Sequence, residues 1–84
     1  MYYFYVLQSL DAKEAFYYGC TSDLRERLKS HNAGQNKSTK GNQWRVVYYE
    51  AFLTLSGARD REYRIKHHGS ARRHLMNRIR ATLE

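Results

Sequence analysis

Cysteine is almost absent from this sequence, which has a single one, Cys20, among 84 residues. One thiol excludes a disulfide within the chain, and no apolar run approaches the roughly 18 residues that a membrane-spanning helix needs. The sequence also has no signal-peptide pattern, no internal repeat and no low-complexity tail, so we expect a cytoplasmic protein. At this length we expect residues 1–84 to form one domain.

Several kinds of site are also missing. The histidines His67, His68 and His74 do not have the spacing of zinc ligands, and no cysteine stands near them. The glycines are not followed by the Gly-Lys-Ser or Gly-Lys-Thr sequence of a phosphate-binding loop. Cys20 has no local signature of a thiol hydrolase, and we expect a buried, inert thiol there.

Acidic residues are few beside the basic ones: 8 Asp and Glu stand against 15 Lys and Arg, for a net charge of +7. A basic balance favours polyanionic partners, namely DNA, RNA or an acidic membrane surface. The alternative is a soluble protein that happens to be basic. Tyrosine is abundant, with eight copies, and its ring packs while its hydroxyl stays available for polar contacts.

The pattern of apolar residues predicts three strands and three helices. Strands are expected over 2–8, 15–19 and 44–51, the first two as a hairpin. Helices are expected from 23 to about 32, from 56 to about 68, and from 70 onward, with a mobile basic loop over 32–43. The order β-β-α-β-α-α favours an α+β fold with a small antiparallel or mixed sheet and helices packed around it.

Side-chain patterns add detail to these elements. On the first strand, Phe4 and Val6 are expected on one face, and the other face takes Tyr3, Tyr5 and Leu7. The candidate N-caps of the three helices are, in order, Ser22 or Asp23, then Ser56, then Ser70. Gly69 is expected to stop the second helix. The buried stripe of the last helix is expected to consist of Leu75, Ile79 and Leu83.

Two side chains on the first predicted helix are candidates for phosphate chemistry. Arg27 and His31 stand four residues apart, so they lie one turn apart on the same face. Arg25 and Lys29 fall on other sides of the helix. The Arg27 guanidinium matches phosphate oxygens, or its stem covers apolar surface. His31 transfers a proton or binds phosphate, or it interacts with the helix dipole.

Three further residues are candidates for the same chemistry. Tyr5 and Tyr17 lie on strands expected to be neighbours, where a hydroxyl orients a water or acts as a base if nearby cations lower its pKa from about 10. The alternative for both is aromatic packing. Glu62 is able to hold a magnesium ion that a substrate phosphate and waters also bind, or it pairs with Lys66 one turn later.

Other basic residues are expected to bind a nucleic-acid backbone without reading its sequence. These residues are Lys37 and Lys40 in the loop, Lys66 on the second helix, and Arg72, Arg73 and Arg78 on the last one.

Taken in order, these segments resemble the GIY-YIG nuclease family, in its small single-domain members. The resemblance is carried by Tyr3-Phe4-Tyr5, by Tyr17-Tyr18-Gly19 with the turn and helix that follow, by Val47-Tyr48-Tyr49-Glu50 and by Arg61-Glu62-Tyr63. The first motif departs from the family, because Tyr3 stands where the family has glycine. The distance from Tyr5 to Tyr17 is slightly long, which a longer hairpin turn would absorb, and Cys20 stands where some members have lysine.

The resemblance implies a three-stranded antiparallel sheet surrounded by helices. It also implies cleavage of a DNA phosphodiester by water with one divalent ion, Mg²⁺ or Mn²⁺. Carried over by position, Tyr5 and Tyr17 are the two family tyrosines, Arg27 stabilises the phosphate, His31 shares its helix face, and Glu62 is the metal ligand.

The leading hypothesis is therefore a metal-dependent endonuclease that acts on duplex, branched or single-stranded DNA and not on a membrane. Two alternatives remain. A nucleic-acid-binding module without turnover predicts salt-sensitive binding but no cleavage. A protein-interaction domain with an exposed aromatic surface predicts little affinity for nucleic acid.

Overall fold

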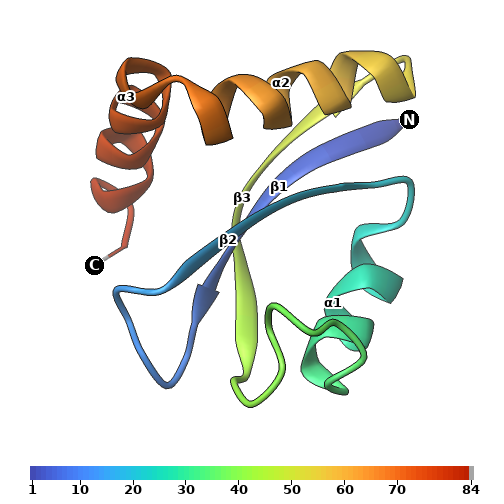
Figure 1. Ribbon diagram of the computed structural model, residues 1–84, viewed down its shortest axis with the longest axis vertical. Coiled ribbons are helices and arrows are strands. Elements are labelled where there is room, and N and C mark those ends of the chain that lie inside the picture. Colours follow the sequence, from blue (N-terminus) through green and yellow to red (C-terminus); the bar gives the residue numbers. More distant parts are fainter. Residues whose placement is uncertain (84) are drawn as a thin grey trace.

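A computed structural model describes residues 1–83 of the chain (Figure 1). Its elements follow the predicted order, so the α+β fold is confirmed. They are β1 (Tyr2–Ser9), β2 (Phe16–Thr21), α1 (Leu24–Asn32), β3 (Trp44–Phe52), α2 (Leu55–His67) and α3 (Gly69–Arg80). In the part of the chain that the structure describes, no helix combines the length and the apolar character needed to cross a membrane.

The sheet is antiparallel, in the order β2-β1-β3, so β1 is the central strand. Tyr5 of β1 is paired with Gly19 of β2 on one side and with Tyr49 of β3 on the other. Since β1 is covered on both edges and both faces, residues 4–9 are all buried. This central position brings Tyr5 into the middle of the molecule.

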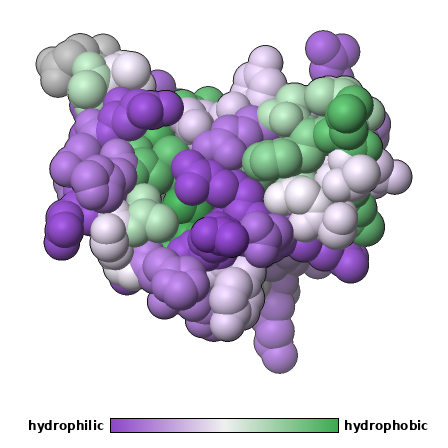
Figure 2. Space-filling view, turned by 90° about the horizontal axis from the view of Figure 1, so that it is seen from above, coloured by the Kyte–Doolittle hydropathy of each residue, from purple (hydrophilic) through white to green (hydrophobic). Residues whose placement is uncertain are grey.

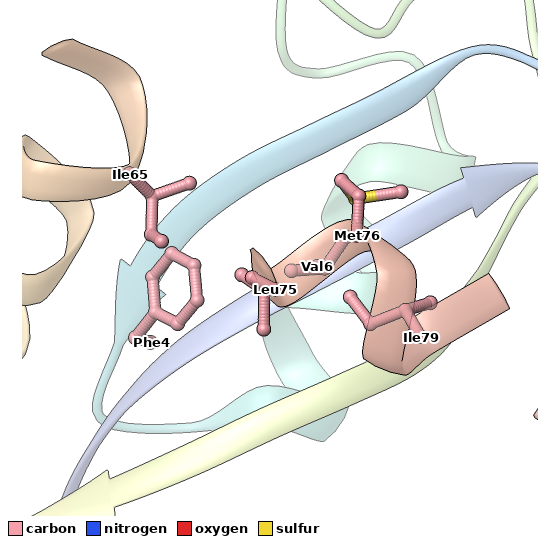
Figure 3. Packing of buried hydrophobic residues seen from close by; sticks show 6 residues of the cluster. All are labelled: Phe4, Val6, Ile65, Leu75, Met76 and Ile79. Atoms are coloured by element: carbon pink, nitrogen blue, oxygen red, sulfur yellow. The ribbon is translucent and has the colours of Figure 1, made fainter. Parts of the chain in front are cut away.

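The two faces of β1 bury different clusters, as the alternation of its residues predicts. Phe4 and Val6 face α2 and α3 (Figure 3). The helices contribute Ile65, Leu75, Met76 and Ile79 to this cluster. Tyr5 and Leu7 face the opposite way, toward Trp44 and the leucines of α1. The sheet therefore separates α1 from the pair α2 and α3, and the residues of the candidate site on β1 belong to the α1 side.

The predicted cap of α1 is confirmed, but the cap of α2 is wrong. The Asp23 carboxylate accepts a hydrogen bond of 3.1 Å from the Glu26 backbone N–H. Ser56 does not cap α2. Thr54 does so instead, and its hydroxyl accepts a bond of 3.1 Å from the Gly57 N–H. Thr54 has the extended backbone that an N-cap requires, whereas Ser56 already lies inside the helix.

The boundary between α2 and α3 also differs from the prediction. His68 separates the two helices, with an extended backbone at φ −122° and ψ 103°. Gly69 is the first residue of α3 and not the stop of α2, and Ser70 therefore lies within the helix and does not cap it. α3 ends at Arg80, so Leu83 lies beyond the helix, although it still packs against the cluster of Phe4 and Val6.

The predicted loop between α1 and β3 has no regular structure, but hydrogen bonds hold it at both ends and in the middle. The Asn32 side chain bonds the backbone N–H and C=O of Trp44, at 2.6 Å and 3.1 Å. The Trp44 indole N–H donates to the Thr39 carbonyl at 3.0 Å, and Thr39 is fully buried. The middle of this polar segment thus reaches the interior beside α1.

Candidate active site

Tyr5 is placed by the glycine opposite it on β2. A Cβ atom at Gly19 would lie 2.5 Å from the Tyr5 hydroxyl oxygen and 2.6 Å from the ring carbon that carries it. Only a residue without a side chain leaves room for the Tyr5 ring to lie across the strand at this point. The glycine of the Tyr17-Tyr18-Gly19 segment is therefore a packing requirement of Tyr5.

The Tyr5 hydroxyl reaches a histidine on the facing helix. Its oxygen lies 2.9 Å from His31 Nε2, and the other ring nitrogen, Nδ1, lies 2.8 Å from the Thr39 hydroxyl. His31 is fully buried. The Tyr17 ring completes the cluster, with its centre 4.9 Å from that of the His31 ring. The structure thus brings together the three residues predicted on β1, β2 and α1.

Arg27 lies one turn before His31 and is partly buried, whereas Arg25 and Lys29 are exposed. Arg27 therefore faces the interior more than its two basic neighbours do. Its positive charge is close enough to Tyr5 to act against the rise in the pKa of the tyrosine. A fixed positive charge thus stands beside the tyrosine hydroxyl.

Burial nevertheless determines the protonation of Tyr5 and His31. It raises the pKa of Tyr5 to about 12, in spite of the opposing charge of Arg27. Arg27 acts in the expected direction, but the low-dielectric surroundings penalise the phenolate more than Arg27 stabilises it, so the pKa of Tyr5 stays above 10. Burial, and secondly the charge of Arg27, lower the pKa of His31. Both side chains are therefore neutral near pH 7.

Glu62 reaches the same region from α2. Its carboxylate forms an ion pair with Lys66 one turn later, as the spacing allows, and the Lys66 ammonium lies 5.9 Å from the centre of the Tyr17 ring. The Glu62 charge also contributes to the raised pKa of Tyr5. α2 thus places one carboxylate and one cation at the outer edge of β2, near the tyrosines.

Cys20 lies between β2 and α2. Its thiol donates a hydrogen bond of 3.1 Å to the Ala58 carbonyl. Burial first, and the neighbouring Glu62 second, raise its pKa to about 12. The residue is only partly buried, but a thiol that stays protonated is a poor nucleophile, in line with the inert role expected for it.

One carboxylate is the donor set that the site offers to a divalent ion. Within residues 1–83 no three His, Cys, Asp or Glu side chains gather into a multidentate site. Mg²⁺ keeps several waters and often takes only one or two carboxylates with substrate phosphates, so Glu62 fits a loosely held ion of this kind. The Lys66 ammonium now occupies that carboxylate and would have to move aside.

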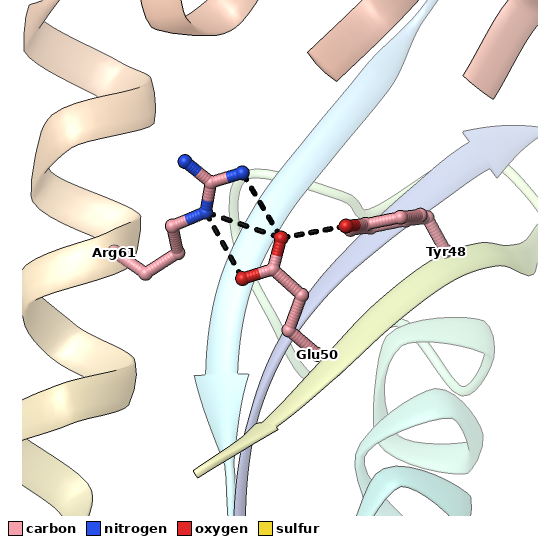
Figure 4. Close-up of polar contacts among 3 residues, drawn as sticks. All are labelled: Tyr48, Glu50 and Arg61. Atoms are coloured by element: carbon pink, nitrogen blue, oxygen red, sulfur yellow. Dashed lines mark hydrogen bonds and ion pairs between the residues drawn. The ribbon is translucent and has the colours of Figure 1, made fainter. Parts of the chain in front are cut away.

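The other acidic residues nearby are also engaged in ion pairs. Figure 4 shows Glu50 on β3 held by two other side chains. Arg61 donates to both of its carboxylate oxygens at 3.0–3.1 Å, and the Tyr48 hydroxyl donates to one of them at 2.6 Å. Asp60 is paired with Arg64 at 3.0 Å. Glu50 therefore ties β3 to α2, which is a structural role.

The residues predicted to bind nucleic acid do not form one surface. Lys37 and Lys40 are exposed in the loop beside α1. Arg72 and Arg73 line a cavity of about 740 Å³ between α3 and β2, which none of the five candidate catalytic side chains lines. Arg78 lines a different cavity, together with Arg61. Figure 2 shows the face above α2 as mostly hydrophilic, with apolar surface visible between the polar side chains.

Residues 1–78 match the family model of the GIY-YIG catalytic domain. The chain belongs to the GIY-YIG family, a family of nucleases. Its relatives include a UPF0213 protein of Lactiplantibacillus plantarum, which is 42% identical over 83% of this chain and 71% of the relative. A UPF0213 protein of Bacillus pumilus is 42% identical over 76% of this chain and 65% of the relative. A UPF0213 protein of Haloquadratum walsbyi is 39% identical over 76% of this chain and 72% of the relative. No solved structure matches this chain at a significant level.

The departures from the GIY-YIG pattern have structural explanations. The longer spacing between Tyr5 and Tyr17 is taken up in the hairpin turn, where the Ser9 hydroxyl accepts hydrogen bonds from the backbone N–H groups of Asp11 and Ala12 at 3.1 Å and 2.9 Å. Tyr3, in place of the first glycine, packs edge-on against Tyr49 of β3, with ring centres 5.8 Å apart. Neither change displaces Tyr5 from His31.

One residue of the site escaped the sequence reasoning. Thr39 stands in a polar segment without periodicity, where nothing distinguishes it from its neighbours. Only the structure shows why Thr39 matters: the chain turns back onto α1 after His31, which brings the Thr39 hydroxyl to the His31 ring. Its contact with His31 joins a helix to an irregular loop and could not be inferred from helix or strand spacing.

Proposed function

We propose that this chain is an endonuclease that hydrolyses DNA phosphodiester bonds with one divalent ion, Mg²⁺ or Mn²⁺. The observation that carries the proposal is the contact of 2.9 Å between the Tyr5 hydroxyl and His31 Nε2, with Arg27 beside it. A buried hydroxyl joined to a neutral imidazole provides a path for a proton, and the arginine provides a site for a phosphate.

Tyr5 is protonated at neutral pH, so it accepts a proton from water only by passing its own proton on. In the proposed step, the attacking water forms a bond to phosphorus while one of its protons moves to the Tyr5 oxygen. The phenol proton moves at the same time to His31 Nε2. The bond from phosphorus to the leaving ester oxygen breaks, and that oxygen takes a proton from solvent. Tyr17, packed against the His31 ring, helps to hold the pair in place.

Arg27 has two roles in the proposed reaction. Its guanidinium donates to the phosphoryl oxygens and stabilises the charge that grows on them in the transition state. A bound phosphate also neutralises the Arg27 charge that disfavours protonation of His31, so substrate binding makes His31 a better proton acceptor. Glu62 is the residue that would hold the metal, and an ion bound there would supply Lewis acidity to the reaction.

The nucleic-acid backbone is proposed to contact basic residues in three regions of the surface, namely the lysines of the loop, Lys66, and the arginines of α3. Support for the α3 side comes from the cavity that Arg72, Arg73 and Arg80 line together. Burial raises the pKa of Tyr18 in that cavity, and the positive charges of Arg72 and Arg80 act against this rise. Closely spaced guanidiniums of this kind suit phosphate groups.

One observation favours the alternative of a nucleic-acid-binding module without turnover. The Lys66 ammonium covers the carboxylate that is proposed to hold the metal. If this pair persists in the complex with DNA, the protein binds the backbone through its charges and does not cleave it.

A single experiment distinguishes the nuclease from the binding module. The pure protein is incubated with labelled duplex, branched and single-stranded DNA, with Mg²⁺, with Mn²⁺ and with a chelator. The nuclease proposal expects cleavage of at least one substrate in the presence of an ion and none with the chelator. The Tyr5→Phe variant should bind as the parent does and lose most of the cleavage, whereas Tyr63→Phe, at an exposed position, should retain it. Salt-sensitive binding without cleavage under every condition would establish the binding module instead.

A further inference from the structure

Thr39 makes the second polar contact of the buried His31 ring. Its hydroxyl oxygen lies 2.8 Å from His31 Nδ1 and 3.3 Å from the Asn36 carbonyl oxygen. Thr39 has no solvent exposure, and the Trp44 indole holds its backbone carbonyl at 3.0 Å. The hydroxyl is therefore fixed between a ring nitrogen and a carbonyl group that can only accept a hydrogen bond.

The direction of the hydrogen bonds follows from counting protons, starting at Tyr5. The Tyr5 side chain is 1% exposed, and among residues 1–83 its hydroxyl has one side-chain hydrogen-bond partner, the His31 ring. The Tyr5 proton then needs an acceptor of its own in a nearly inaccessible position, and His31 Nε2 is the atom within reach. A buried hydroxyl proton without an acceptor is strongly disfavoured.

A neutral imidazole carries one N–H, so acceptance at Nε2 places that N–H on Nδ1. The N–H on Nδ1 donates to Thr39, whose own proton goes to the Asn36 carbonyl. All four groups are then satisfied. In the opposite arrangement Thr39 donates to Nδ1, the N–H lies on Nε2 and points at Tyr5, and the Tyr5 proton loses its acceptor.

We propose that Thr39 is a positioning residue that keeps His31 in the tautomer with its proton on Nδ1, so that Nε2 receives the proton of Tyr5. This inference rests on the proposed function for its catalytic meaning, but the tautomer itself does not depend on any substrate. As His31 becomes an imidazolium, the same Thr39 oxygen continues to accept from Nδ1, which helps the ring to carry the transferred proton.

The test uses two variants at Thr39. Thr39→Val keeps the shape of the side chain and removes the acceptor, whereas Thr39→Ser keeps the hydroxyl. The ring nitrogens of His31 are observed by ¹⁵N NMR in the free protein near pH 8, where the imidazole is neutral. The parent and Thr39→Ser should show the proton on Nδ1, and Thr39→Val should show a shift toward the Nε2–H form. In cleavage assays Thr39→Val should lower kcat by about 10²-fold with little change in KM, and Thr39→Ser should recover most of it.

A parent spectrum with the proton on Nε2 would overturn the proposal, and so would an unchanged tautomer in a folded Thr39→Val protein. If Thr39→Val does not fold, the parent and Thr39→Ser spectra still decide the question. Absence of cleavage in the parent, together with the expected tautomer, would contradict the nuclease function and leave the inference about Thr39 standing.

Discussion

The Tyr5 ring lies against Gly19 so closely that a Cβ atom on Gly19 would stand 2.5 Å from the tyrosine oxygen. This distance is far below ordinary van der Waals contact, and it involves a ring that is itself held by His31. The glycine on β2 and the tyrosine on β1 are therefore parts of one arrangement, and the position of the proposed proton path depends on both.

The Gly19→Ala variant should lose both stability and activity. The methyl group forces the Tyr5 ring away from β2, and overpacking of this kind typically costs about 1–3 kcal/mol of unfolding free energy. Urea denaturation measures the cost. In a Tyr5→Leu background the clash disappears, so the same substitution should cost clearly less there. Equal costs in the two backgrounds would mean that Gly19 serves the backbone and not the tyrosine.

The Arg27→Ala variant should lose about 10²–10³-fold in cleavage rate while remaining folded, because it removes a charge donor fixed beside the proposed phosphate site. Arg25→Ala is the matched control, since Arg25 has the same charge on the same helix but is exposed. Its rate should change far less. Similar losses at the two positions would show that Arg27 acts only through its general charge. Circular dichroism and single-turnover rates suffice for the comparison.

Stability should depend on pH through His31. Burial lowers its pKa in the folded protein below the value of about 6.5 expected in the unfolded chain, so the unfolded state binds the proton more readily. The contribution is fully present above about pH 6.5 and declines as the pH falls toward the folded pKa. Urea midpoints between pH 7.5 and 5.5 should therefore fall for the parent. His31→Gln should show a weaker dependence, and His74→Gln, at an exposed position, should behave as the parent does. An unchanged slope in His31→Gln would contradict the account.

The sequence was sufficient for the elements with strong local signals. The alternation of Phe4 and Val6 against Tyr5 and Leu7 predicted both faces of β1, because a strand has a fixed period of two. Asp23 could be predicted as a cap, beside Ser22, because an N-cap carboxylate and the backbone N–H that donates to it lie three residues apart. The cap of α2 was predicted wrongly because Thr54 and Ser56 are both common N-cap residues, and their types do not show which of them has the extended backbone.

Only those features of the site that follow from residue spacing or from the family resemblance could be predicted. Arg27 and His31 share a helix face by geometry, so their convergence could be foreseen. The direction of the Tyr5 pKa shift could not be predicted, because it depends on how deeply elements distant in sequence bury β1. The same holds for Thr39, whose contact with His31 depends on the path of an irregular loop. Local patterns do not encode burial or loop paths.

The role of Glu62 is the central claim, and one paired titration tests it most directly. Cleavage and binding of labelled DNA are measured against Mg²⁺ and Mn²⁺ for the parent and for Glu62→Gln, with Asp60→Gln as a matched control on the same helix. The account predicts that Glu62→Gln binds DNA as tightly as the parent or slightly more tightly, because a negative charge is removed from a basic protein. It should lose cleavage and its response to both ions, while Asp60→Gln keeps them. Metal-dependent cleavage at the parent rate by Glu62→Gln would contradict the account.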